Sequence, residues 1–266
     1  MGVLRGLRRY RLGGWLPTVG RGGPARPRGR PWLNFGGRSF NSAQELLLFT
    51  LYRHLVPRVE EIVLFTGFNN LGLARLPRWM QGDSGAFFNG HEYLEQVREL
   101  RIRQRRAAGQ SRRAARREPQ RPSADQAVPD LDGQLTAAVE LTLRHLDTWR
   151  LLAEGLGARL TFVLQPLAPW VRERPATEEQ LLFDELDAIA NFGRAYGDIC
   201  TIEAGRRYVD QLRGGCDKLG VPFLDMNPVL GGAIDADDWI FVDRIHFTDH
   251  GHDIVAGLLA DRLSLR

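Results

Sequence analysis

Residues 236–263 read ADDWIFVDRIHFTDHGHDIVAGLLADRL, and the rest of the chain can be interpreted around them. Asp243 and His246 stand three residues apart, directly before a helix that is predicted to begin near Thr248. A carboxylate at this spacing can accept the Nδ1 proton of the imidazole, which fixes the tautomer and leaves Nε2 to act as a general base toward a nucleophile. The pair is therefore a candidate for the acid–base half of a hydrolytic site.

The surrounding sequence strengthens this interpretation. The apolar run 239–242 leads into the pair, and Thr248 supplies N-cap chemistry for an amphipathic final helix. The pattern Asp-x-x-His-x-Thr-Asp-x-Gly-His near a C-terminus resembles the last block of the SGNH (GDSL-type) hydrolase family. The resemblance implies a serine ester hydrolase or acyltransferase in which His246 is the base and Asp243 orients it.

A second block follows an apolar segment. Residues 61–66, EIVLFT, are apolar enough to be covered on both faces, as parallel strands are, and they end in Gly67-Phe68-Asn69-Asn70. These four residues resemble the family's Gly-x-Asn-Asp signature, with Asn70 where the family usually has Asp, and a simple turn is the alternative interpretation. The resemblance implies that the Asn69 side chain donates to the oxyanion, and the C-terminal end of a parallel strand is where open α/β sheets bind ligands.

A third block precedes these two. Residues 34–45, NFGGRSFNSAQE, resemble the family's glycine-containing block. When the two are aligned on Asn34 and Ser42, the family's oxyanion glycine corresponds to Ser39. The expected contribution is a backbone N–H, which serine also has, so the substitution matters only if φ at this position must be positive.

The block that carries the family's nucleophile is missing. The family takes its serine from a Gly-Asp-Ser motif at the end of the first strand, and nothing in residues 1–31 resembles that motif. Gly82-Asp83-Ser84 spells it, but no strand is predicted before it, so we interpret the match as chance and keep Ser84 only as an alternative nucleophile. Loss of the first strand would expose two strand edges. This predicts either a replacement strand from residues 1–30 or a displaced start of the recorded chain, and we favour the displaced start.

The remaining periodicity predicts strands that alternate with helices. Helices are expected over 135–149, from a capping box at 177–180 onward, and near 203–218, with strands at 160–165 and 221–225. Alternation of this kind indicates an α/β fold with a parallel sheet. Together with the resemblance, it predicts a three-layer α/β/α, flavodoxin-like domain over residues 32–266 whose first strand is missing or replaced.

Two arginine-rich segments interrupt this pattern. Residues 1–31 are rich in Arg, Gly and Pro and contain no acidic residue, which predicts a disordered leader, with a transit peptide or a nucleic-acid-binding arm as alternatives. Residues 98–121 carry ten Arg within an insertion that extends over about 98–130. Such dense like charges repel one another, and no aromatic residues alternate with them, so we do not expect nucleic-acid binding.

Composition limits the other classes of function. Cys200 and Cys216 are the only cysteines, so a disulfide framework is excluded and a reduced, cytoplasmic protein is expected. No apolar run approaches the roughly 18 residues that a membrane span needs, so we expect no membrane among its partners. The partner implied by the resemblance is a small-molecule or glycan ester, and no cofactor is implied.

Two alternatives stay open, and whether the chain is an enzyme stays open with them. Without its serine block, the chain could be a non-catalytic member of the family whose pocket binds a ligand. A metal site could use His246, His250 and His252 with neighbouring Asp residues, since imidazole and carboxylate suit zinc. His250 and His252 lie two residues apart at a helix start, so their side chains diverge and we expect no metal. We assign no role to the other three histidines, which are His54, His91 and His145.

Overall fold

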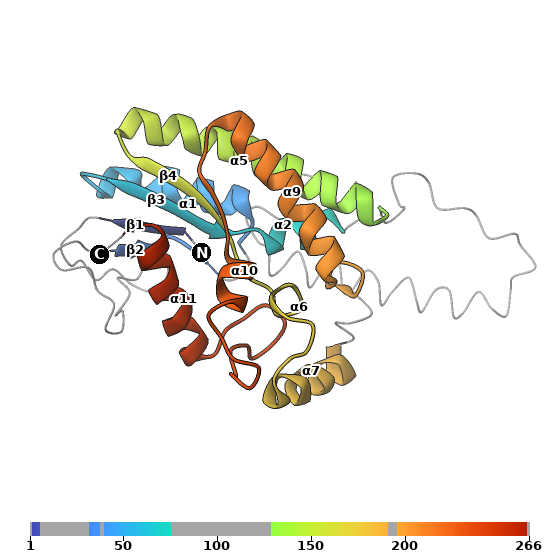
Figure 1. Cartoon of the computed structure of the whole chain (residues 1–266). Helices are drawn as coiled ribbons and strands as arrows, with labels where there is room; N and C mark the ends of the chain where they lie inside the picture. Colours follow the sequence, from blue (N-terminus) through green and yellow to red (C-terminus); the bar gives the residue numbers. More distant parts are fainter. Residues whose placement is uncertain (1, 6–31, 38–39, 76–128, 191–195, 265–266) are drawn as a thin grey trace, which may run out of the picture.

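The structure is a computed structural model that describes residues 2–5, 32–37, 40–75, 129–190 and 196–264 (Figure 1). Five strands form one sheet in the order β2-β1-β3-β4-β5. Their bounds are Gly2–Arg5 for β1, Trp32–Asn34 for β2, Glu61–Thr66 for β3, Arg159–Leu164 for β4 and Phe223–Asp225 for β5. β3, β4 and β5 are parallel, and β1 is antiparallel to both of its neighbours. The fold is therefore α/β with a three-stranded parallel part, in agreement with the predicted class.

β1 fills the position between β2 and β3. Val3 lies opposite Asn34 of β2 and opposite Val63 of β3, and because β1 is antiparallel to both, β2 and β3 run in the same direction. The lack of hydrophobic periodicity before Pro31 predicts no element there, whereas four of those residues form a strand. β1 thus occupies the position in the sheet where the family resemblance predicts a missing or replaced strand. Residues 6–31 lie outside the described residues.

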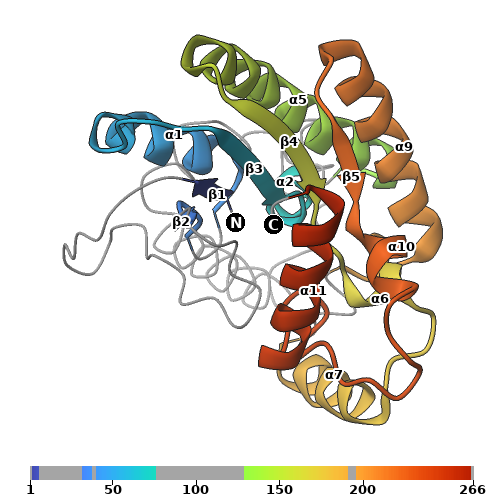
Figure 2. The ribbon, with the colours of Figure 1, turned by 60° about the vertical axis from the view of Figure 1, so that its left-hand side comes forward.

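Helices cover both faces of the sheet (Figure 2). α5 packs against α1, α2 and α9 on one face, whereas α10 and α11 pack together on the other. The bounds are Ser42–Tyr52 for α1, Phe68–Ala74 for α2, Leu131–Leu156 for α5, Ala168–Val171 for α6, Thr177–Ala190 for α7, Ile202–Leu219 for α9, Met226–Gly231 for α10 and Asp249–Arg262 for α11, with a 3-10 turn, η1, at Arg53–Leu55. Among the described residues, no helix has the length and apolar character that crossing a membrane requires.

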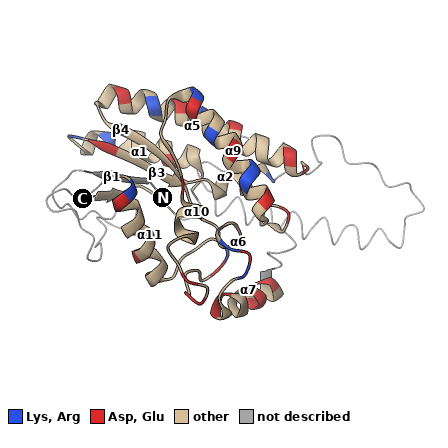
Figure 3. Cartoon of the chain, viewed as in Figure 1, with Lys and Arg blue, Asp and Glu red and all other residues tan. Residues whose placement is uncertain are grey.

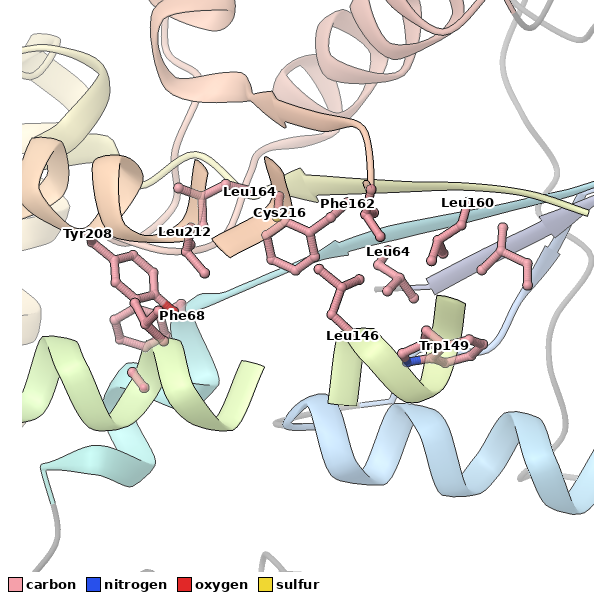
Figure 4. Packing of buried hydrophobic residues seen from close by; sticks show 14 of the residues in the cluster. Leu64, Phe68, Leu146, Trp149, Leu160, Phe162, Leu164, Tyr208, Leu212 and Cys216 are labelled. Carbon is pink, nitrogen blue, oxygen red and sulfur yellow. The ribbon is translucent and has the colours of Figure 1, made fainter. Parts of the chain in front are cut away.

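The two faces of the sheet bury separate apolar clusters. Leu64 and Phe162 point toward α5, where Leu146 and Trp149 cover them (Figure 4). Val63, the neighbour of Leu64 in β3, belongs to the cluster on the opposite face. Successive side chains of a strand alternate between faces, so the run of apolar residues in β3 supplies both cores. Full burial of one such Leu or Phe side chain contributes about 1.5–3 kcal/mol.

Most helix ends follow the signals in the sequence. Asn41 caps α1 in a capping box with Gln44, and Gly157, at φ 62°, ends α5 in the left-handed conformation. The capping box predicted at 177–180 does not form as expected, and among the described residues only one bond of that kind is present, one residue earlier. α7 begins at Thr177, but it is the Glu179 carboxylate that accepts a hydrogen bond from the backbone N–H of Ala176, at 3.1 Å.

Candidate functional site

Asp243 and His246 form a hydrogen-bonded pair on the loop between α10 and α11. Asp243 Oδ2 lies 2.7 Å from His246 Nδ1, and Oδ1 accepts hydrogen bonds of 2.7 Å from the backbone N–H groups of Ile245 and His246. The His246 side chain is 71% exposed, so a substrate can approach it from solvent. The structure therefore brings together the two residues that the sequence pairs by spacing.

The environment of Asp243 favours its ionised form. Partial burial alone would raise the pKa of this carboxyl, but the hydrogen bonds from the His246 ring and from two backbone N–H groups outweigh burial and hold the pKa below its usual value. An ionised carboxylate can only accept, so the hydrogen on the short Nδ1–Oδ2 contact belongs to His246. Nδ1 is thus the protonated nitrogen, and the basic nitrogen of neutral His246 is Nε2.

Glu179 of α7 holds the segment that leads into this pair. Its side chain is fully buried, and Oε1 accepts hydrogen bonds from the backbone N–H groups of Ile240 and Phe241, at 2.9 and 3.0 Å. Oε2 lies 2.7 Å from Arg172 Nη2 and also accepts from Ala176. Four partners offset the cost of burying the charge. Sequence reasoning missed this residue, because the only local signal was an acidic residue in the first turn of a helix.

Arg172, the partner of Glu179, also holds the part of this loop that precedes Ile240. Its guanidinium donates to the backbone carbonyls of Asp235 and Ala236, each at 3.0 Å, and to that of Asp238 at 2.6 Å. The side chains of Arg172 and Glu179 therefore hold residues 235–241 against α6 and α7, and all of these hydrogen bonds are to main-chain atoms of the loop. This arrangement fixes the path of the loop whatever side chains it carries.

A second ion pair, besides Arg172–Glu179, fixes the loop next to the Asp243–His246 pair. We call this pair the dyad and the segment that carries it the dyad loop. Arg244 donates to both carboxylate oxygens of Asp187, at 2.9 and 2.7 Å, and its guanidinium lies over the Phe183 ring. Asp187 belongs to α7, a helix that carries acidic and no basic residues (Figure 3). The backbone carbonyl of Arg244 accepts from Ala168 at the start of α6, which follows β4. The dyad thus lies at the carboxyl end of the parallel strands, where α/β sheets bind ligands.

The first turn of α11 packs directly on this loop. Thr248 caps the helix by accepting a hydrogen bond from Gly251, and its own backbone N–H donates to Ile240 at 2.8 Å. A Cβ at Gly251 would come within 2.4 Å of the Ile240 carbonyl oxygen, so this position needs glycine. The Thr and Gly of the C-terminal block therefore have a structural explanation: they place α11 against the dyad loop.

Asn69 lies in the first turn of α2, which directly follows β3. β3 neighbours β4, the strand that leads to α6 (Figure 1). Gly67 turns the chain between β3 and α2 at φ 136°, and a Cβ at this position would come within 2.5 Å of Leu164. The Asn69 side-chain Nδ2 donates to the Phe40 carbonyl at 2.6 Å. An amide carries two N–H donors, so one can be directed at an oxyanion while the other holds Phe40. Ser39, Ser84 and His91 lie outside the described residues.

Both cysteines are poor candidates for a nucleophile. Burial raises the pKa of Cys200 to about 11 and that of Cys216 to about 12, and neither forms a disulfide. The thiolate is the reactive form of cysteine, and at neutral pH these groups are thiols. Neither cysteine therefore offers a thiolate nucleophile at neutral pH.

The described residues do not support a metal site. No group of three or more His, Cys, Asp or Glu side chains among them is placed to hold an ion. His250 and His252 are exposed at the start of α11, and the His252 ring packs edge-on against Phe247. His145, to which the sequence assigns no role, lies 2.8 Å from the Ser42 hydroxyl.

A pocket of the described residues lies away from this chemistry. Its walls include Glu61, Arg159 and Leu160, at the amino ends of β3 and β4. It therefore lies at the amino ends of the parallel strands, whereas the dyad lies at their carboxyl ends. Arg159 and Glu61 pair there at 2.7 Å. This pocket has no connection with the predicted site residues.

No family model matches the chain, and a search of curated proteins finds no significant match.

Proposed function

We propose that the chain is an SGNH-type serine ester hydrolase or acyltransferase that acts on a small acyl or carbohydrate ester. The observation that carries the proposal is the 2.7 Å contact between Asp243 Oδ2 and His246 Nδ1, at the carboxyl end of a parallel sheet. The order of the three blocks along the chain supports it, as does the cover of helices on both faces of the sheet. The finer arrangement that this family implies, a flavodoxin-like α/β/α domain, is part of the same proposal.

In this reaction His246 acts first as a base and then as an acid. Nε2 takes the proton of a serine hydroxyl as its oxygen attacks the ester carbonyl, and the imidazolium then gives that proton to the leaving alcohol. Asp243 stabilises the imidazolium and keeps Nδ1 protonated throughout. Water, or an acceptor alcohol, then attacks the acyl-enzyme with the same help from His246. The first acceptor gives hydrolysis and the second gives acyl transfer.

The oxyanion is stabilised from the neighbouring strand end. Asn69 directs one amide N–H at the developing negative charge while the other N–H stays on the Phe40 carbonyl. The backbone N–H of Ser39 is the second donor of the proposal. Ser84 stays only an alternative nucleophile, because its Gly-Asp-Ser match is interpreted as chance, and Ser39 and Ser84 both lie outside the described residues.

The proposal is tested by assaying the purified chain with p-nitrophenyl acetate and p-nitrophenyl butyrate. If this chain contains the nucleophilic serine, the wild type hydrolyses these esters, and His246→Ala lowers kcat/KM by about 10²- to 10⁴-fold, which is the usual contribution of a positioned base. Asp243→Asn should lower it as well, because an amide at this position does not hold the correct tautomer. His250→Ala is the matched control, since it removes an exposed imidazole four residues away and should leave the rate unchanged.

The serine is identified in the same experiment. Loss of activity in both His246→Ala and Ser84→Ala would make Ser84 the nucleophile, whereas loss in His246→Ala alone would direct the search to hydroxyl groups in residues 1–42. A sharp fall of kcat/KM in His250→Ala would favour the alternative of a metal site. A folded wild-type chain that hydrolyses neither ester would contradict the proposal and favour a binding protein with the same fold.

A further inference from the structure

Four polar side chains from α1, α2 and α5 form a hydrogen-bonded network beside Asn69. Asn70 Nδ2 donates to Ser42 Oγ at 2.8 Å and to Thr142 Oγ1 at 2.6 Å, while Asn70 Oδ1 accepts from the Ser42 backbone N–H at 3.1 Å. The Ser42 hydroxyl also lies 2.8 Å from His145 Nδ1. Ser42, Asn70 and Thr142 are all at most 4% exposed. None of the four has a part in the chemistry proposed above.

The donors and acceptors of this network fix the orientation of Asn70. A backbone N–H can only donate, so the atom that faces Ser42 N must be the amide oxygen. Thr142 gives its own proton to the Ala138 carbonyl at 2.7 Å, so its oxygen has to accept from Asn70 Nδ2. A carboxylate in place of the amide would face Thr142 Oγ1, whose hydrogen is already bonded to Ala138, so this contact would lose its donor. The network thus explains Asn at position 70, where the family resemblance leads us to expect Asp.

The network joins the two segments that carry the oxyanion groups. Asn70 is the chain neighbour of Asn69 in the first turn of α2, and Ser42 begins α1 two residues after Phe40. The Asn69 amide donates to the Phe40 carbonyl, so both ends of this contact belong to segments that the network holds. Thr142 and His145 anchor these first turns on α5, a 26-residue helix that packs against both. The direction of the Asn69 amide therefore depends on this network, of which Ser42, Asn70 and Thr142 are buried.

We propose that Ser42, Asn70, Thr142 and His145 are positioning residues that hold the Asn69 amide in the direction an oxyanion requires. This inference rests on the proposed function, because it assigns the four residues to the oxyanion side of that reaction. Displacing a catalytic group by about 1 Å can cost 10²-fold in rate, so a supporting network of this kind carries part of the catalysis. Its effect falls on the transition state, because the negative charge on the carbonyl oxygen develops only there.

The test removes one acceptor from the network without changing the shape of the side chain. Thr142→Val leaves Asn70 Nδ2 with one acceptor fewer, and Thr148→Val is the matched control. Thr148 lies on the same helix and bonds back to the carbonyl four residues earlier in the same way, but it is exposed. We expect Thr142→Val to lower kcat about ten- to a hundredfold with KM nearly unchanged. Thr148→Val should match the wild type.

A double-mutant cycle separates positioning from general stability. Asn69→Ala removes the oxyanion donor and should cost about 10²- to 10³-fold in kcat. If the network acts through Asn69, adding Thr142→Val to that variant lowers kcat no further. Additive losses, or a Thr142→Val protein whose kcat per folded molecule equals that of the wild type, would overturn the inference. A second cycle combines Asn70→Asp with Asn69→Ala, and we again expect the double variant to have the same kcat as Asn69→Ala alone.

Hydrogen exchange decides the inference independently of activity. Backbone amides of residues 67–71 should exchange faster in Thr142→Val than in Thr148→Val, while those of 243–248 should not differ between the two variants. If the wild type hydrolyses neither ester, the proposed function fails but this measurement still applies. Equal exchange at 67–71 in the two variants would show that the network does not position this segment.

Discussion

Glu45 is a carboxyl group in the first turn of α1 that is only 3% exposed. Burial raises its pKa above the ordinary value of 4.5, although a hydrogen bond with Thr66 acts in the opposite direction. A group whose pKa is raised by folding contributes most to stability below its unfolded pKa, and that contribution is lost as the pH rises through the folded pKa. We therefore expect Glu45→Gln, which cannot ionise, to be more stable than the wild type at pH 8 and nearly equal to it at pH 4.5. Each unit by which the pKa is raised corresponds to about 1.4 kcal/mol.

Urea unfolding at pH 4.5, 6 and 8 measures this difference. Glu178→Gln provides the control, because Glu178 also lies in the first turn of a helix but is exposed, and its replacement should give no comparable gain as the pH rises. A Glu45→Gln protein less stable than the wild type at pH 8 would mean that the ionised carboxylate has favourable partners that outweigh its burial.

At the scale of elements, α7 acts as a support for the dyad loop through Glu179. Removal of one partner from a buried ion pair leaves the other uncompensated, which usually costs 3–5 kcal/mol. We expect Glu179→Ala to lower the free energy of unfolding by about this amount. Glu179→Gln keeps an oxygen for the N–H groups of Ile240 and Phe241 and should cost less. Glu185→Ala, an exposed change on the same helix, should stay within about 0.5 kcal/mol of the wild type.

Chemical denaturation of the three variants checks this order, and esterase assays of the folded fractions add a second criterion. If Glu179 supports the loop, Glu179→Ala also lowers kcat/KM, because Asp243 and His246 follow directly on the residues it holds. A Glu179→Ala protein with wild-type stability would show that Arg172 alone fixes the loop.

The sequence predicts elements well where periodicity and end signals agree. The apolar run of β3, the glycine that ends α5 and the Thr cap of α11 each depend on neighbours within a few residues, so they are visible locally. The Asp243–His246 pair is predictable for the same reason, since its geometry is set by a three-residue spacing. Glu179 and the Ser42–Asn70 contact are not, because they join residues 61 and 28 positions apart. Such pairs become visible only when the fold brings the elements together.

At the scale of the whole molecule, β1 is the element that completes the sheet. Without it, the facing edges of β2 and β3 would expose unpaired backbone groups, which promotes association between chains. We expect Val3→Pro, which removes one N–H from the middle of β1, to lower the free energy of unfolding by about 1–3 kcal/mol, the usual cost of a buried group that loses its hydrogen-bond partner. It should also increase light scattering on standing. Val3→Ile, which keeps the N–H and a β-branched side chain, is the control and should behave as the wild type.

The same strand connects the sheet to the oxyanion side of the site. β1 pairs with β2, which leads toward Phe40, and with β3, which leads to Asn69. The dyad loop, in contrast, is held by α6, α7 and α11. Hydrogen exchange in Val3→Pro should therefore rise first at 61–71 and only slightly at 239–248. Equal loss of protection in both regions would mean that the molecule opens as one cooperative unit. Unchanged protection in both would mean that β1 contributes nothing to holding β2 and β3 together.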